Sequence, residues 1–168
     1  MDESRKVVVV RSTGTVDGKG ILYWMFSRKQ LEMVLREIEP APVLPAAEGF
    51  CEAAIAWQEE ILPVVCLEKY FGLAEETQAP PGRHLVLKAA AQQGDEVSVS
   101  MIVLPVYTDL QMGSVSGGGK PVAPDFLKIN AGDILGAFEL AAGKIAILPD
   151  ICRIASRSRT ILMKQGRP

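Results

Sequence analysis

Apolar residues along this chain fall mostly into short runs that end at glycine, proline or polar residues. The first run, residues 6–11, contains four consecutive valines, and a β-branched run of this kind favours a strand with both faces covered. Asp17-Gly18 is a dipeptide typical of hairpin turns, and residues 21–26 have the aromatic-rich composition of a returning strand. The N-terminal part of the chain is therefore expected to form a β-hairpin.

A helical periodicity begins at Ser27. Ser27 and Gln30 have the spacing of a capping box, in which the hydroxyl caps the first turn and the Gln side chain reaches back to it. Apolar residues then recur at the i, i+3, i+4 and i+7 positions of one helix face, namely Leu31, Val34, Leu35 and Ile38. Because proline cannot continue a helix, Pro40 ends the pattern. The sequence therefore predicts an amphipathic helix over residues 31–38.

The rest of the chain returns to short strand-like segments. Strands are predicted at residues 52–57, 61–67, 84–91, 97–106, 134–140 and 144–148. One helical turn is expected at residues 68–71. A C-terminal helix capped by Asp150 is expected to carry one apolar side, formed by Ile151, Ile154, Ala155, Ser158 and Leu162. Since no helix of crossover length separates successive strands, the pattern favours an antiparallel barrel or a pair of barrels over a parallel doubly wound sheet.

One of these strands has a specific alternation. In residues 97–106, apolar side chains alternate with two serines in the order Val97, Ser98, Val99, Ser100, Met101 and Val103. Successive strand residues point to opposite faces of a sheet, so one face of this strand is predicted to start polar and end buried.

Composition narrows the class of protein. The 168 residues suit one domain, and the apolar share of 48% and charged share of 23% are ordinary for a globular chain. The net charge of −2 and the pI near 5.5 argue against nucleic-acid binding, which requires a basic face. No stretch approaches the roughly 18 apolar residues of a membrane span. Cys51, Cys66 and Cys152 are isolated among apolar neighbours, typical of free thiols in a reducing compartment, so we expect a cytoplasmic protein.

Residues suited to catalysis or metal binding are scarce. His84 is the only histidine, and no nucleophile-elbow sequence accompanies it. The chain has no C-x-x-C, no H-x-x-x-H and no calcium-loop spacing. We therefore expect no enzyme activity and no cofactor or metal. Two alternatives stay open: a small molecule held in a groove between two barrels, and a hydrolase or transferase that uses His84.

Several motifs occur in the order seen in one known family. They are Arg36-Glu37-Ile38 through Val43-Leu44-Pro45, then Ile61-Leu62-Pro63-Val64-Val65-Cys66-Leu67, Tyr70-Phe71-Gly72-Leu73, and a closing pair from Ile134-Leu135-Gly136 to Asp150. In these segments the chain resembles the CheW family of chemotaxis coupling proteins, from about Ile21 to Ile154. The resemblance implies a mostly β fold of two small SH3-like five-stranded barrels, with a short helix after the second strand and a C-terminal helix. It also implies that residues 1–168 form a single domain of two interleaved subdomains.

The resemblance implies a non-catalytic adaptor without a cofactor. Its partners would be the regulatory domain of a CheA-type histidine kinase and, in addition, chemoreceptors, while self-association stays open. The residues expected on or beside the partner surface are Leu35, Glu37, Ile38, Trp57, Gln58 and Ile61. For the apolar members Leu35, Ile38 and Ile61, ordinary core packing is an equally strong interpretation.

The chain departs from the family pattern where partner coupling is expected. The family sequence Asn-Leu-Arg-Gly falls on Ala56-Trp57-Gln58-Glu59, and a family Asp falls on Cys66. Gln58 lacks the charge and the donor fork of the family arginine. Glu59 replaces a glycine, so a left-handed turn there would be strained. A divergent member that binds a different protein partner and a small-ligand-binding β-barrel protein are therefore alternative hypotheses.

Overall fold

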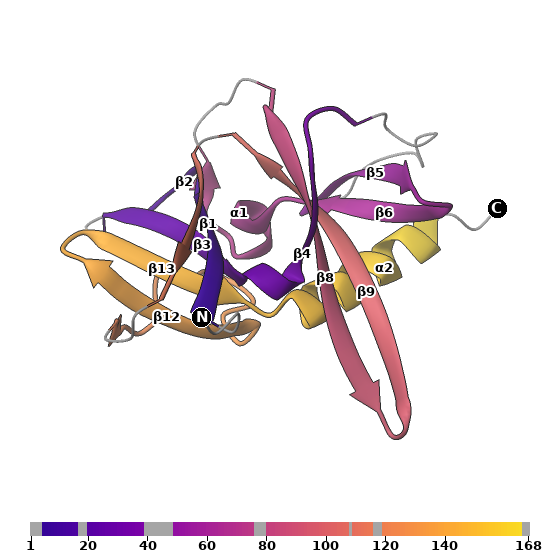
Figure 1. Cartoon of the computed structure of the whole chain (residues 1–168). Coiled ribbons are helices and arrows are strands. Elements are labelled where there is room, and N and C mark those ends of the chain that lie inside the picture. Colours follow the sequence, from indigo (N-terminus) through magenta and orange to yellow (C-terminus); the bar gives the residue numbers. More distant parts are fainter. Residues whose placement is uncertain are drawn as a thin grey trace.

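Two β-sheets make up most of the fold in the computed structural model, which describes residues 5–16, 20–38, 49–75, 80–107, 109–115 and 119–165 (Figure 1). The first sheet has the strand order β10-β1-β3-β13-β12-β11 and contains β1 (Lys6–Arg11), β3 (Ile21–Ser27), β10 (Leu110–Ser114), β11 (Lys120–Pro121), β12 (Ile134–Ala141) and β13 (Lys144–Pro149). The second has the order β4-β8-β9-β6-β5 and contains β4 (Leu31–Leu35), β5 (Cys51–Trp57), β6 (Glu60–Val65), β8 (Arg83–Gln93) and β9 (Glu96–Val106).

The chain builds these sheets in an interleaved order. It leaves the first sheet after β3, forms the whole second sheet, and returns to the first at β10. Most neighbouring strands are antiparallel, whereas β13 pairs with β3 and β6 pairs with β9 in parallel. A small third sheet joins β2 (Gly14–Thr15) to β7 (Ala74–Glu75). The expected mostly β fold is confirmed, with one six-stranded and one five-stranded sheet in place of two five-stranded barrels.

The named helical elements of the described residues complete the fold. They are a 3₁₀ turn, η2 (Arg28–Gln30), and the α-helices α1 (Leu67–Tyr70) and α2 (Ile151–Gln165). The Asp150 side chain caps α2 by accepting a hydrogen bond from the Arg153 backbone N–H at 3.2 Å. Of the predicted apolar side of α2, four residues are buried and Leu162 is half-buried, so this prediction is confirmed. None of the described helices is long and apolar enough to cross a membrane.

The prediction of an amphipathic helix over residues 31–38 is wrong. The capping box does form, since the Gln30 side chain accepts from the Ser27 backbone N–H at 3.1 Å, but it closes only the single turn of η2. Leu31–Leu35 is strand β4, paired antiparallel with β8. The segment is apolar on both faces because Val34 packs against one core and Leu35 against another. This two-sided burial produces the i, i+3, i+4 spacing without a helix.

A central core fills the space between the two sheets. Its largest fully buried side chains are Trp24 and Phe26 from the first sheet, together with Tyr70 and Phe71 from α1 and its end. One face of β8 and β9 and the buried side of α2 complete it. A second cluster, formed by Ile55, Leu62, Val64, Val86 and Val103, lies on the opposite face of the second sheet. The second sheet is therefore covered on both faces.

A buried carboxylate links the first sheet to α1. The Glu68 side chain, only 7% exposed, accepts hydrogen bonds at Oε1 from Ser12 Oγ at 2.8 Å, the Thr13 backbone N–H at 3.1 Å and Trp24 Nε1 at 2.9 Å. A charged group is rarely buried without partners, and three donors satisfy this one. Glu68 therefore serves as a structural connection between the hairpin region and the helix.

Candidate partner-binding site

The tip of the β5–β6 hairpin is the first place where the expected partner residues can be located. Trp57 pairs with Glu60, which leaves Gln58 and Glu59 as a two-residue turn. Their φ angles are +46° and +67°, and turns with two positive φ values favour Asn-Gly sequences. The turn therefore adopts the left-handed conformation that the family glycine suits, and it does so with two residues that have a Cβ.

Three of the six expected partner residues lie together. Leu35 at the end of β4, Ile38 just beyond it and Trp57 at the end of β5 are all half-buried against the second cluster. They come from segments about 20 residues apart, in or next to the two edge strands of the second sheet, and the second cluster is the common core against which all three pack. Their partial exposure combines core packing with a surface that a partner can contact.

The other three expected residues are exposed. Glu37 is exposed between Leu35 and Ile38, and Gln58 is exposed at the hairpin tip. Ile61 is 57% exposed and pairs with Ala56. Its neighbour Leu62 belongs to the second cluster, so Ile61 points to the opposite face of β6. The structure thus does not bring all six residues onto one surface. The exposure of the Ile61 side chain argues against core packing for this residue.

A further apolar surface lies on the long β8–β9 hairpin, which projects from the body of the molecule (Figure 1). Val97 and Val99 are 65% and 53% exposed, although they share a face of β9 with Met101 and Val103. Met101 packs against the second cluster beside the Leu35, Ile38 and Trp57 group. We call Val97, Val99 and Met101 the hairpin strip. It continues the same face of the second sheet outward into solvent.

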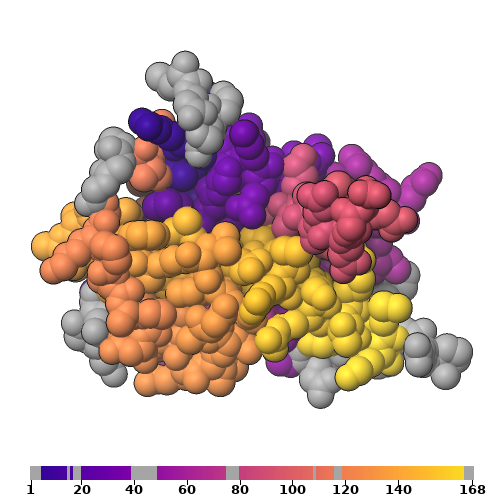
Figure 2. Space-filling model, turned by 90° about the horizontal axis from the view of Figure 1, so that it is seen from below, coloured from indigo at the N-terminus to yellow at the C-terminus, as the bar shows by residue number. Residues whose placement is uncertain are grey.

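The hairpin strip was missed as a candidate site, although its alternation is visible in the sequence. The expectation that one face of this strand starts polar and ends buried is confirmed on the serine side, where Ser98 is exposed and Ile102 and Leu104 are buried. The valine side also starts exposed, and its outer residues are apolar. The alternation shows which residues share a face, but it does not show that the hairpin extends beyond its neighbouring strands. Seen from below, α2 lies between the first sheet and the outer part of this hairpin (Figure 2). The other face of the hairpin base is thus covered by α2 and the central core.

His84 lies inside β8, where the register places it between Leu35 of β4 and Pro105 of β9. Its side chain is 8% exposed, its Nδ1 has no hydrogen-bond partner among the described residues, and burial lowers its pKa. Such a site gives a substrate little access. The described residues also contain no group of three or more His, Cys, Asp or Glu residues that could hold a metal ion.

The cysteines are free, with Cys51 and Cys66 buried and Cys152 half-buried. Burial, with a smaller contribution from the charge of Glu52, raises the pKa of the Cys51 thiol to about 11. A thiol of this kind stays protonated near neutral pH and is a poor nucleophile. The side chains described so far therefore favour contacts with a partner over covalent chemistry.

Comparisons with known proteins agree with this geometry. The sequence pattern of the CheW-like domain matches residues 30–159. The crystal structure of scaffolding protein TtCheW from Thermoanaerobacter tengcongensis is similar in fold, with a TM-score of 0.59 and 16% sequence identity over 89% of this chain and 86% of that chain. No curated protein matches the sequence. Since the matched pattern spans most of the chain, the protein belongs to the CheW-like family.

Proposed function

We propose that this protein is a non-catalytic cytoplasmic adaptor in chemotaxis-type signal transduction. It binds the regulatory domain of a CheA-type histidine kinase, and a chemoreceptor is its second partner. In this proposal residues 1–168 act as a single CheW-like domain of two interleaved subdomains. No cofactor takes part, because the adaptor works by holding other proteins together.

The observation that carries the proposal is the apolar surface on the second sheet. It runs from half-buried Leu35, Ile38 and Trp57 to the exposed Val97 and Val99 of the hairpin strip. Large contiguous apolar patches are rare on the surface of soluble monomers, and where they occur they usually mark an interaction site. The family match supports the class of partner, and TtCheW, which shares the fold, is itself a scaffolding protein.

Charge and turn geometry make Glu37 and Gln58 the polar part of this surface. Glu37 is exposed beside the apolar group, so its carboxylate can form an ion pair with a cation on the partner. Because this side chain is exposed, we do not expect the fold to depend on it. Gln58 can donate and accept hydrogen bonds but cannot form the bidentate ion pair of an arginine. We therefore expect affinity to depend mainly on the apolar residues and on Glu37.

The test is calorimetric titration of the purified protein against the kinase regulatory domain of the same organism. The double variant Val97→Ser/Val99→Ser should weaken binding about tenfold or more, since it removes apolar contact area from the interface. Leu135→Ser is the matched control, because Leu135 is 68% exposed on β12 in the first sheet. It should leave the affinity unchanged.

Glu37→Lys provides an independent electrostatic test. It should weaken binding while leaving the melting temperature almost unchanged, because surface substitutions usually change stability by less than about 0.5 kcal/mol. An unchanged affinity would remove Glu37 from the site. If Leu135→Ser weakened binding and the double valine variant did not, the partner would bind the first sheet instead. Absence of any binding to the kinase domain would favour the divergent module with another protein partner.

A further inference from the structure

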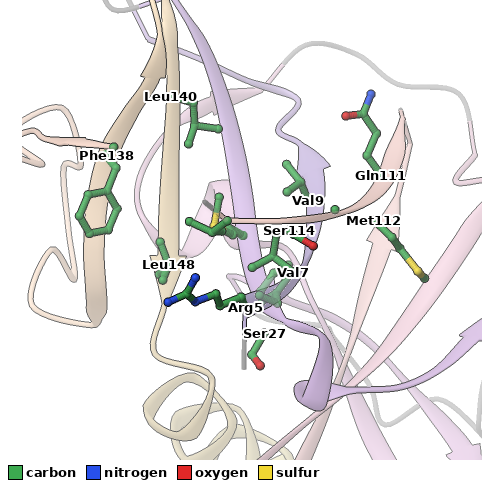
Figure 3. Close-up of a pocket in the computed structure, with 15 residues that line it drawn as sticks. Arg5, Val7, Val9, Ser27, Gln111, Met112, Ser114, Phe138, Leu140 and Leu148 are labelled. Atoms are coloured by element: carbon green, nitrogen blue, oxygen red, sulfur yellow. The ribbon is translucent and has the colours of Figure 1, made fainter. Parts of the chain in front are cut away.

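The first sheet has a groove on the face that points away from the central core. The groove has a volume of about 830 Å³, and Figure 3 shows side chains from β1, β10, β12 and β13 around it. Val7 and Val9 form one wall, and Phe138, Leu140 and Leu148 form the opposite one. This volume lies within the range of ligand-binding cavities, roughly 300–1,000 Å³.

Strand β1, which lines the groove, is apolar on both faces. In β1, Val8 and Val10 belong to the central core, whereas Val7 and Val9 are half-buried and line the groove. The four-valine run predicts a strand covered on both sides, and the structure covers it fully on one side only. In the second sheet the corresponding outer face is closed by the second cluster, whose five residues are at most 4% exposed. Within the part of the chain that the structure describes, the outer face of the first sheet thus lacks the apolar cover that its composition calls for.

Gly113 contributes to the openness of the groove. It pairs with Val7 across β10 and β1, so a side chain there would point to the groove face. A Cβ added at Gly113 would meet no atom within 4 Å. The backbone therefore leaves room at the position where a larger residue would fill the cavity.

One charged group lies at the groove. Arg5 is the only charged residue among the described residues that line it. The Arg5 side chain extends toward Leu148 across the space between the walls (Figure 3). It is exposed and takes part in none of the ion pairs formed between described residues. A cation beside apolar walls, with no carboxylate among the described residues of the lining, is complementary to an anion that carries a hydrocarbon chain.

We propose that this groove binds a long-chain carboxylate, with the hydrocarbon chain against Val7, Val9 and Phe138 and the carboxylate paired with Arg5. A single anionic headgroup on a long chain occurs both in free fatty acids and in membrane lipids. The site lies on the first sheet, away from the proposed partner surface on the second. It therefore stands independently of the adaptor proposal.

The test uses dodecanoate as the probe and dodecanol as its uncharged analogue, each titrated into the full chain by calorimetry. Dodecanoate should bind at one to one. Arg5→Gln should weaken dodecanoate binding about tenfold and leave dodecanol binding unchanged, because only the carboxylate forms a charge-assisted hydrogen bond. Gly113→Leu should abolish the binding of both ligands by filling the groove.

Gly82→Leu is the matched control for the filling variant. A Cβ added at Gly82 would also meet open space, and this residue is not part of the groove lining. The variant should keep wild-type binding, and circular dichroism should confirm that both leucine variants are folded. Unchanged dodecanoate binding in Gly113→Leu would overturn the proposal, as would absence of binding by the wild-type chain. Co-sedimentation with phosphatidylglycerol vesicles distinguishes the two ligand sources, and vesicle binding without dodecanoate binding would also overturn the groove assignment.

Discussion

Replacing Asp133 by Ala should loosen the attachment of α2 to the rest of the protein. The Asp133 carboxylate is 3% exposed and accepts a hydrogen bond from the Tyr70 hydroxyl of α1. It also pairs with Arg153 Nη1 at 3.3 Å and Arg157 Nε at 3.2 Å, both on α2. Burial and the hydrogen bond to Asp133 raise the pKa of the Tyr70 phenol, which therefore donates as a neutral group. One carboxylate thus connects the two α-helices.

The magnitude follows from the exposure of each partner. Arg153 and Arg157 are 64% and 55% exposed, so each ion pair contributes at most about 1 kcal/mol and leaves no buried charge when broken. The Tyr70 hydroxyl is buried, and a hydrogen bond to a charged group contributes roughly 1.5–3 kcal/mol. Asp133→Ala should therefore lower the free energy of unfolding by about 2–4 kcal/mol. At about 2–4 °C per kcal/mol, the melting temperature should fall by roughly 5–15 °C.

Urea denaturation of Asp133→Ala, Tyr70→Phe and the double variant would measure this connection. Tyr70→Phe should lower the free energy of unfolding less than Asp133→Ala does, because Asp133 still forms its ion pairs with Arg153 and Arg157 in that variant. The double variant should cost less than the sum of the single variants, with a coupling of about 1–2 kcal/mol. Arg153→Met is the control and should cost no more than about 1 kcal/mol. Additive single effects, or a loss below about 0.5 kcal/mol for Asp133→Ala, would refute the reasoning.

Two further predictions concern local strain and pH. Glu59→Gly should raise the free energy of unfolding by about 0.5–1 kcal/mol, because relief of the left-handed conformation at this residue exceeds the added chain entropy of glycine. Gly94→Ala should lower the free energy of unfolding, because alanine would have to adopt a φ of +64° there, although its Cβ would meet open space. Equal stability of the wild type and both variants in urea denaturation would contradict this reasoning. Burial lowers the pKa of His84 below its ordinary 6.5, so the unfolded chain takes up a proton first as the pH falls, and stability is lost below about pH 6.5. Below about pH 6.5, the free energy of unfolding of the wild-type chain should fall by up to about 1.4 kcal/mol more per pH unit than that of His84→Met. If the two curves of stability against pH ran parallel, they would argue against a buried neutral histidine.

The strands could be predicted because their signals are local. The β8–β9 and β12–β13 hairpins turn at Gly94 and Gly143, whose φ angles of +64° and +76° are the left-handed values that glycine favours. Asp150 likewise marks the start of α2 through its own side chain. The Asp17-Gly18 turn lies outside the described residues, although the adjacent Val16 and Gly20 form an antiparallel bridge. Each of these features depends on residues a few positions apart.

The error over residues 31–38 has a non-local cause. The capping box at Ser27 and Gln30 is genuine, but pairing with β8 decides the conformation of the following five residues. Val34 and Leu35 face opposite cores, so the apolar positions fit a helix only because both faces of the strand are covered. Periodicity distinguishes a helix from a strand when one face is polar, and this segment does not meet that condition.

The candidate partner surface depends on where strands end, and no local pattern contains that information. Val97, Val99, Met101 and Val103 occupy one face of β9, yet Val103 is fully buried and Val97 is 65% exposed. The difference arises because β5 and β6, which supply Ile55, Leu62 and Val64, cover only the inner part of that face. The same reasoning applies to β1, where the valines facing the core are covered and those facing the groove are not. Alternation identifies the residues that share a face, whereas the chain segments packed on that face decide whether it is core or binding surface.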